Sequence, residues 1–199
     1  MPINEKYLAK FESEEYYHIY NRSPSNRKLF LYPDNYFFFL DLIKKHLEDS
    51  LKFLSYCLIP NHFHLFAQVR KTFFEKDDVH RMVSEQFRKV FLSYANAFNK
   101  KYKTHGALFT TPFKRILVDS GDYFSEVIRY IHHNPVHHKM HPNFESYRYS
   151  SYNSLLSDKP TLLERDFVLD WFRGKENFIN FHKIEPKSPY AEFPFYIEE

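Results

Sequence analysis

The sequence is poor in glycine and cysteine, and both shortages narrow what the protein can do. Only 3 of its 199 residues are glycine, so the glycine-rich loops that cradle nucleotide phosphates are effectively excluded. The single cysteine, Cys57, excludes a disulfide framework and any zinc site built from several cysteines. A reducing, cytoplasmic setting is the simplest expectation for such a chain.

Long apolar runs are also missing. The longest are only a few residues, as in Tyr36–Leu40, whereas a helix that spans a bilayer needs about 20. The N-terminal stretch carries charges throughout and has no apolar core, so it does not read as a signal peptide. We therefore expect no membrane partner.

Acidic residues are absent from one long segment. The net charge is only +3, yet no Asp or Glu lies between Gln86 and Val118, where seven Lys or Arg residues fall. Such a basic segment attracts phosphate backbones. It is equally consistent with a solvated helix whose C-terminal end carries cations that the helix dipole favours. Charge alone leaves both interpretations open.

What the chain does have is a mixture of strand and helix patterns. Period-two or apolar β-rich runs predict strands, and a spacing of three or four residues predicts helices. The expected strands are 15–22, 51–60, 62–69 and 113–119, and the expected helices are 33–47, 75–102 and 121–134. Short links favour an α+β class with a largely antiparallel sheet. We assign residues 1–155 to one domain and residues 156–199 to a C-terminal helical extension and tail, which from Pro186 looks loose or partner-dependent.

Two histidines stand in the apolar strand pattern IPNHFHLFAQV. Side chains alternate along a strand, so His62 and His64 share one face while Phe63 and Leu65 take the other. Two adjacent neutral imidazoles suit a divalent transition metal, or Mg²⁺ or Mn²⁺ completed by oxygen ligands. The alternative is a pair of histidines on a solvent-facing strand.

A later helix pattern offers a nucleophile and a further ligand. Glu126, Tyr130 and Asn134 follow a spacing of four residues and share one helix face, opposite an apolar face that we expect to pack on the sheet. Tyr130 would otherwise be a surface tyrosine. Asn134 precedes Pro135, so we expect it at the frayed helix end, where it would otherwise be a cap. Glu126 is a candidate for orienting a ligand or proton. Four histidines of this segment are expected to face solvent or DNA: His132, His137, His138 and His141.

Three motifs together resemble a known family. They are Pro60–Leu65 (PNHFHL), Phe113–Arg115 (FKR) and Tyr130–Val136 (YIHHNPV), in this order and spacing. They closely resemble the single-tyrosine HUH transposases, and among these the REP-associated tyrosine transposases. Tyr17–Arg22 and Tyr149–Tyr152 add supporting matches.

The resemblance implies a fold and a chemistry. It implies a ferredoxin-like α/β sandwich with a central antiparallel sheet and helices packed on it. It also implies that His62, His64 and Asn134 bind one divalent ion, Mg²⁺ or Mn²⁺, and that Tyr130 is the nucleophile. Such enzymes are DNA nickases and ligases that cleave single-stranded DNA at hairpins through a 5′-phosphotyrosine and rejoin it by transesterification, as in DNA transposition and recombination. Rejoining needs no ATP, which agrees with the lack of a phosphate-binding loop.

Further expectations concern partners. Single-stranded or hairpin DNA is the expected partner, and cytoplasmic localisation would become nucleoid-associated on binding. A homodimer is possible, since relatives include dimers and monomers. Candidate phosphate contacts are Arg22, Arg27, Lys28, Lys114 and Arg115.

Two other functions fit parts of the pattern. One is a domesticated, non-catalytic binder of hairpin DNA or RNA that keeps the fold. The other is a metal-dependent hydrolase of small phosphoesters that uses the same histidines, although the basic segment would then have no role.

Overall fold

A computed structural model describes residues 7–24, 27–72 and 76–184. The segment from Pro186 that we predict to be a loose extension lies outside these residues. Among the described residues, no helix is long and apolar enough to cross a bilayer.

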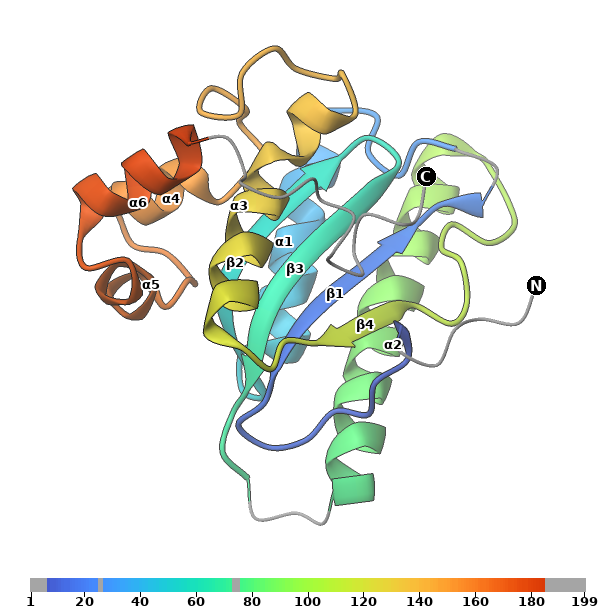
Figure 1. Cartoon of the computed structure of the whole chain (residues 1–199). Coiled ribbons are helices and arrows are strands. Elements are labelled where there is room, and N and C mark those ends of the chain that lie inside the picture. The colour runs from blue at the N-terminus through green and yellow to red at the C-terminus, as the bar shows by residue number, and fades with distance from the viewer. Residues whose placement is uncertain (1–6, 25–26, 73–75, 185–199) are drawn as a thin grey trace.

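The sheet has four strands, and every neighbouring pair is antiparallel (Figure 1). The elements in chain order are β1 (Tyr16–Arg22), α1 (Pro33–Leu47), β2 (Leu51–Ile59), β3 (His62–Val69), α2 (Lys76–Tyr102), β4 (Lys114–Leu117), α3 (Gly121–His137), α4 (Tyr152–Leu156), α5 (Arg165–Trp171) and α6 (Lys175–Lys183). The first six elements run β-α-β-β-α-β with spatial strand order β2-β3-β1-β4. This is the ferredoxin-like arrangement, so the predicted α+β class is confirmed.

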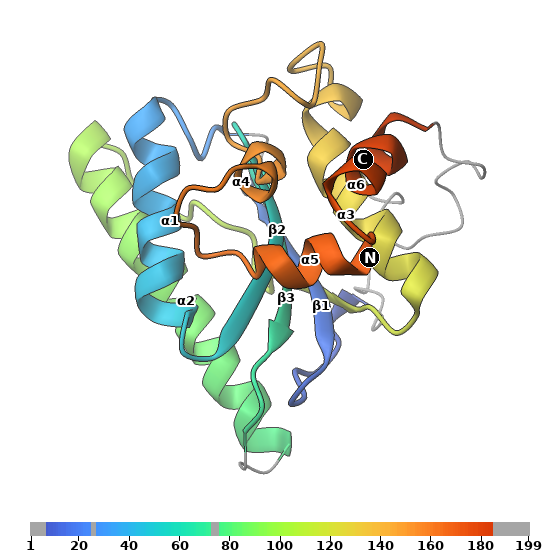
Figure 2. The same ribbon diagram turned by 90° about the vertical axis from the view of Figure 1, so that its left-hand side faces the viewer.

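Helices cover both faces of the sheet. Figure 2 shows α1 and α2 on one side and α3 on the other, with α6 outside α3. The alternation of β3 explains the layers: Phe63 packs on Phe39 of α1 and Phe91 of α2, with ring centres 4.9 and 5.9 Å apart. Phe66, on the opposite face, packs on Phe124 of α3 at 4.8 Å. The aromatic stripe of α2 is core, as its spacing predicts.

The predicted hairpin joins β2 and β3. Ile59 pairs with His62 across the Pro60–Asn61 turn. The backbone N–H groups of Leu29 and Phe30 both donate to the Pro60 carbonyl, and Ser23 N–H donates to Asn61 O at 2.9 Å. The loop after β1 is thereby fixed beside the turn, and His62 lies at this end of the sheet.

Helix α3 begins as predicted but ends later. Ser120 is the N-cap and its hydroxyl oxygen accepts a hydrogen bond from Tyr123 N–H. The expected end at Asn134 is wrong: the helix continues through Pro135 to His137, and His138 N–H donates to Asn134 O at 3.1 Å. Asn134 is therefore a regular helical residue, one turn beyond Tyr130, and not a frayed cap.

The C-terminal helices pack on the outer side of α3. His132 of α3 is fully buried, and its Nδ1 lies 2.8 Å from Nε2 of His182 in α6 while its Nε2 lies 2.8 Å from the Ser151 hydroxyl. The expectation that His132 faces solvent or DNA is wrong. Arg129 also reaches this layer by donating to Ile184 O at 3.1 Å.

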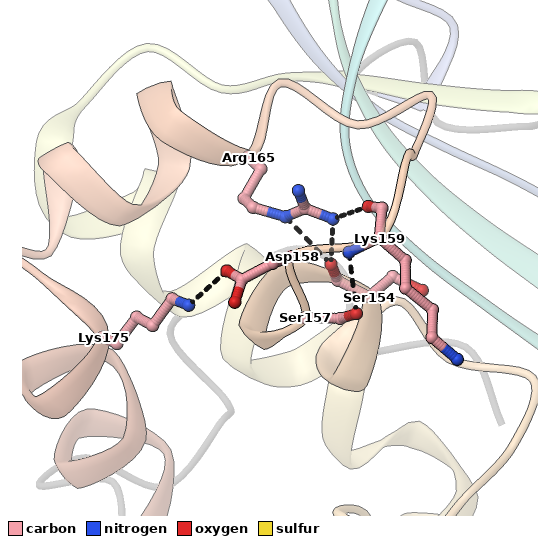
Figure 3. A network of polar contacts seen from close by, with 6 residues as sticks. All are labelled: Ser154, Ser157, Asp158, Lys159, Arg165 and Lys175. Atoms are coloured by element: carbon pink, nitrogen blue, oxygen red, sulfur yellow. Dashed lines mark hydrogen bonds and ion pairs between the residues drawn. The ribbon is translucent and has the colours of Figure 1, made fainter.

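The chain between α4 and α6 is held by its own polar network (Figure 3). Arg165 donates to the carbonyls of Ser154 and Lys159, and Lys175 pairs with Asp158 at 2.9 Å. The boundary that we predict after residue 155 falls within α4, and the division into domain and extension stays a prediction.

Candidate active site

Three side chains from distant segments meet at the α3 face of the sheet. His62 Nε2 lies 3.0 Å from Asn134 Oδ1, and Asn134 Nδ2 lies 3.2 Å from His64 Nε2. The Asn134 amide thus bridges the two histidines that strand alternation places together. Asn134 is fully buried, His64 is nearly so, and His62 is half-buried.

Both histidines are neutral. Burial lowers the pKa of His62 to about 3, helped by His138 nearby, and burial holds the pKa of His64 well below its usual value. A neutral imidazole has one N–H, yet both ring nitrogens of His62 face amide oxygens, Asn61 Oδ1 at 3.0 Å and Asn134 Oδ1 at 3.0 Å. A cation between His62 Nε2 and Asn134 Oδ1 satisfies both atoms, while Nδ1–H donates to Asn61. The donor set of two imidazoles and one amide oxygen therefore fits a divalent ion.

The third candidate ligand, the side-chain amide of Asn134, is not one of the usual metal-binding side chains. Within the described part of the chain, no three His, Cys, Asp or Glu side chains are grouped to hold a metal. Only an amide completes the trio.

Tyr130 lies beside this group. Its ring stands edge-on to His64, with ring centres 5.4 Å apart and planes at 87°, and edge-on to His18 at 5.9 Å. Tyr130 is only 7% exposed, so it faces the sheet. The alternative of a surface tyrosine in water is therefore wrong. Tyr20 of β1 completes the aromatic wall, with its ring nearly parallel to His64 at 5.4 Å.

Comparisons with known proteins agree with this geometry at the level of the fold. No protein-family model matches the sequence, and no curated protein matches it significantly. Among solved structures, the chain is similar to a REP-associated tyrosine transposase bound to a REP hairpin, with a TM-score of 0.62 and 16% identity. The match covers 80% of this chain and 89% of that chain. The chain has the fold of a tyrosine transposase.

Within this transposase fold, two of the predicted phosphate contacts lie near the histidines. Arg22 pairs with His62 in the sheet, and its charge contributes to the lowered pKa of both His62 and Lys114. Burial is the larger cause for Lys114, whose ammonium lies 5.8 Å from the Tyr20 ring centre and 5.3 Å from that of Tyr7. Arg22 and Lys114 therefore give this part of the site a positive potential.

The other three predicted contacts lie elsewhere or are occupied. Arg27 donates to His105 O at 3.3 Å and stacks on Phe98, at the end of α2. Lys28 is exposed in the same loop. Arg115 is buried between Phe11 and Phe113 and donates to the carbonyl of Ala9 at 2.7 Å. Arg115 thus anchors the N-terminal segment, which argues against a phosphate contact.

The acid-poor segment does not form one basic surface at the site. Most of its cations lie on α2, which covers the opposite face of the sheet (Figure 2). There Arg88 pairs with Glu85 at 2.7 Å and Lys101 with Asp34 at 3.8 Å. This placement favours the interpretation of a solvated helix.

Glu126 does not reach the histidine group. Its carboxylate pairs with the buried Arg129, which turns toward α6. Glu126 therefore belongs to the packing of α3 on the C-terminal layer, and the idea that it orients a ligand finds no support.

Two more residues lie at the site: His18, to which the sequence analysis gives no role, and His138, which it expects to face solvent or DNA. His18 of β1 is fully buried, with Nε2 only 2.9 Å from His64 Nδ1. His138, just past α3, has its ring centre 4.5 Å from that of His62. Strand alternation in the sequence predicts that Tyr16, His18 and Tyr20 point to one face of β1. The sequence does not predict that β1 pairs with β3, and this pairing brings His18 next to His64.

Proposed function

We propose that this protein is a metal-dependent single-strand DNA endonuclease and strand transferase that acts at hairpins, with Tyr130 as nucleophile. The observation that carries the proposal is the meeting of Tyr130 with His62, His64 and Asn134. These residues come from two segments about seventy positions apart in sequence, and they are the ones that the family resemblance requires.

The reaction assigned to Tyr130 is a transesterification. Its phenolic oxygen attacks the phosphorus, the P–O3′ bond breaks, and the 3′ oxygen leaves as a free hydroxyl once protonated. The product is a 5′-phosphotyrosine, whose phosphodiester energy permits the reverse step without ATP. A tyrosine hydroxyl with its usual pKa near 10 is a weak nucleophile, so the phosphate must be activated.

A divalent ion, Mg²⁺ or Mn²⁺, held by His62, His64 and Asn134 would supply Lewis acidity for the phosphate and the leaving oxygen. The chain itself supplies orientation, since the Tyr130 ring packs against His64 and His18. Arg22 and Lys114 would bind phosphates that flank the cleaved bond.

The experiment uses labelled hairpin oligonucleotides taken from palindromes that flank the gene. Incubated with Mn²⁺, the wild-type chain should form a covalent protein–DNA adduct visible on a denaturing gel. Tyr130→Phe should abolish the adduct while keeping hairpin affinity, because only the attacking oxygen is removed.

Tyr123→Phe is the matched control, since Tyr123 is a buried tyrosine two turns earlier on the same helix. It should retain the adduct. If Tyr123→Phe loses it and Tyr130→Phe does not, the nucleophile is misassigned. If the wild type binds hairpins with Mn²⁺ present but never forms an adduct, the protein is a non-catalytic binder.

A further inference from the structure

One ring nitrogen of the candidate metal group contacts a residue outside the ligand set. His18 Nε2 lies 2.9 Å from His64 Nδ1, and the two rings are nearly coplanar, at 22°, with centres 5.1 Å apart. This is an edge-to-edge N–H···N hydrogen bond and not a stack. His18 is fully buried.

The position of the proton on His64 determines which histidine donates in this hydrogen bond. The His64 ring carries its N–H on the nitrogen that does not accept a hydrogen bond. Its Nε2 receives the amide N–H of Asn134, with Nδ2 at 3.2 Å, so Nε2 acts as an acceptor. The proton of His64 therefore resides on Nδ1 and is donated to His18 Nε2. That arrangement leaves the lone pair of His64 Nε2 directed toward Asn134 and His62.

We propose that His18 is a positioning residue that holds His64 as the Nδ1–H tautomer, so that Nε2 carries no proton and can bind a divalent ion. The inference rests on the metal centre of the proposed function. Histidines that bind metals usually donate their second nitrogen to a carboxylate, a carbonyl or water, which fixes tautomer and ring orientation. Here a neutral histidine does so, and the ligand set stays without negative charge.

The surroundings of His18 are consistent with this role. Tyr20 and Tyr130 pack against its ring, with centres 5.1 and 5.9 Å away. Aromatic rings thus contact His18 on two sides, and its Nε2 lies 2.9 Å from His64 Nδ1. The opposite tautomer of His64, with the proton on Nε2, would direct an N–H at the ion and prevent binding.

Three variants of His18 separate the hydrogen bond from the space that the ring fills. His18→Gln keeps an acceptor oxygen near the position of Nε2. His18→Asn keeps a similar amide but places it near the position of Nδ1, out of reach of His64. His18→Phe keeps a ring and removes the acceptor. Tyr20→Phe is the control, because it removes a hydroxyl next to His18 and His64 but keeps the ring and the bond between the two histidines.

The first readout is the tautomer of His64 in the metal-free protein, from long-range ¹H–¹⁵N correlation spectra assigned with His64→Gln. Wild type, His18→Gln and Tyr20→Phe should show Nδ1–H, while His18→Asn and His18→Phe should shift His64 toward Nε2–H. The second readout is Mn²⁺ affinity without DNA, followed by electron paramagnetic resonance. His18→Asn and His18→Phe should lose roughly 10–100-fold, the usual effect of removing such a partner, and His18→Gln should restore it.

The outcomes separate this inference from the proposed function. A wild-type His64 that carries its proton on Nε2, or an unchanged tautomer and Mn²⁺ affinity in His18→Phe, overturns the role of His18 even if the Tyr130 adduct forms. Loss of Mn²⁺ affinity in all three His18 variants would reduce His18 to a packing residue. A missing adduct together with the expected tautomers and affinities overturns the strand-transfer proposal and supports His18 as the residue that orients the metal ligand.

Discussion

Two neighbouring cations of β4 should affect different properties when they are replaced: Arg115 the stability of the protein, and Lys114 its binding of DNA. Arg115 is 9% exposed and donates to Ala9 O at 2.7 Å, with longer contacts of 3.4 Å to the carbonyls of Leu8 and Phe113. The short bond from a charged donor is worth about 1.5–3 kcal/mol. Stacking between two aromatic rings adds about 1 kcal/mol. Arg115→Leu should therefore lower the free energy of unfolding by about 3 kcal/mol, as measured by urea denaturation.

Lys114 is the matched variant, since it is adjacent in sequence and half-buried beside Tyr20. Lys114→Leu should cost little stability but weaken hairpin binding, and it should reduce the slope of log affinity against log salt by about 1, for one lost phosphate contact. In Arg115→Leu protein that remains folded, the slope of log affinity against log salt should be the same as in the wild type. A stable Arg115→Leu protein whose salt slope falls by the same amount would refute the assignment of Arg115 to packing.

Two further predictions concern the site and its support. Asn134→Asp should tighten Mn²⁺ binding, because a carboxylate replaces an amide between His62 and His64; calorimetry that finds equal or weaker binding contradicts the ligand set. Acid should destabilise the contact of α3 with α6, because burial lowers the pKa of His182 to about 3 and that of His132 well below its usual value. Since the unfolded chain binds protons with a pKa near 6.5, stability should be complete above that pH. Below that pH, the free energy of unfolding should fall by about 1.4 kcal/mol per pH unit for each of these histidines. Urea denaturation between pH 7 and pH 5 measures this fall.

Periodicity was enough to predict the elements of the sheet. The alternation around His62 and His64 predicts a strand with both imidazoles on one face, and Phe63 does pack on the opposite face. The Pro60–Asn61 break predicts the hairpin, which forms. These features depend on neighbours within a few residues, so local sequence contains them.

The errors concentrate on α3, and they share a cause. An amphipathic helix is expected to bury one face and expose the other. The sequence pattern therefore leaves a surface position open for Tyr130 and predicts that His132 faces solvent or DNA. In the structure α3 lies between the sheet and α6, and both side chains are buried. Both ring nitrogens of His132 are satisfied by residues outside α3, His182 and Ser151. No local pattern reports such a partner.

The same packing explains why α3 passes through Pro135. A proline inside a helix costs about 3 kcal/mol in isolation, and the sequence rule therefore ends the helix at Asn134. Contacts on both sides offset that cost: Asn134 bridges the histidines on the sheet side, while His133 Nε2 lies 2.9 Å from His182 O on the other. The position of Asn134 is therefore set jointly by β3 and by α6. It follows that the C-terminal helices help to align the candidate ligands, although no atom of α6 belongs to the ligand group.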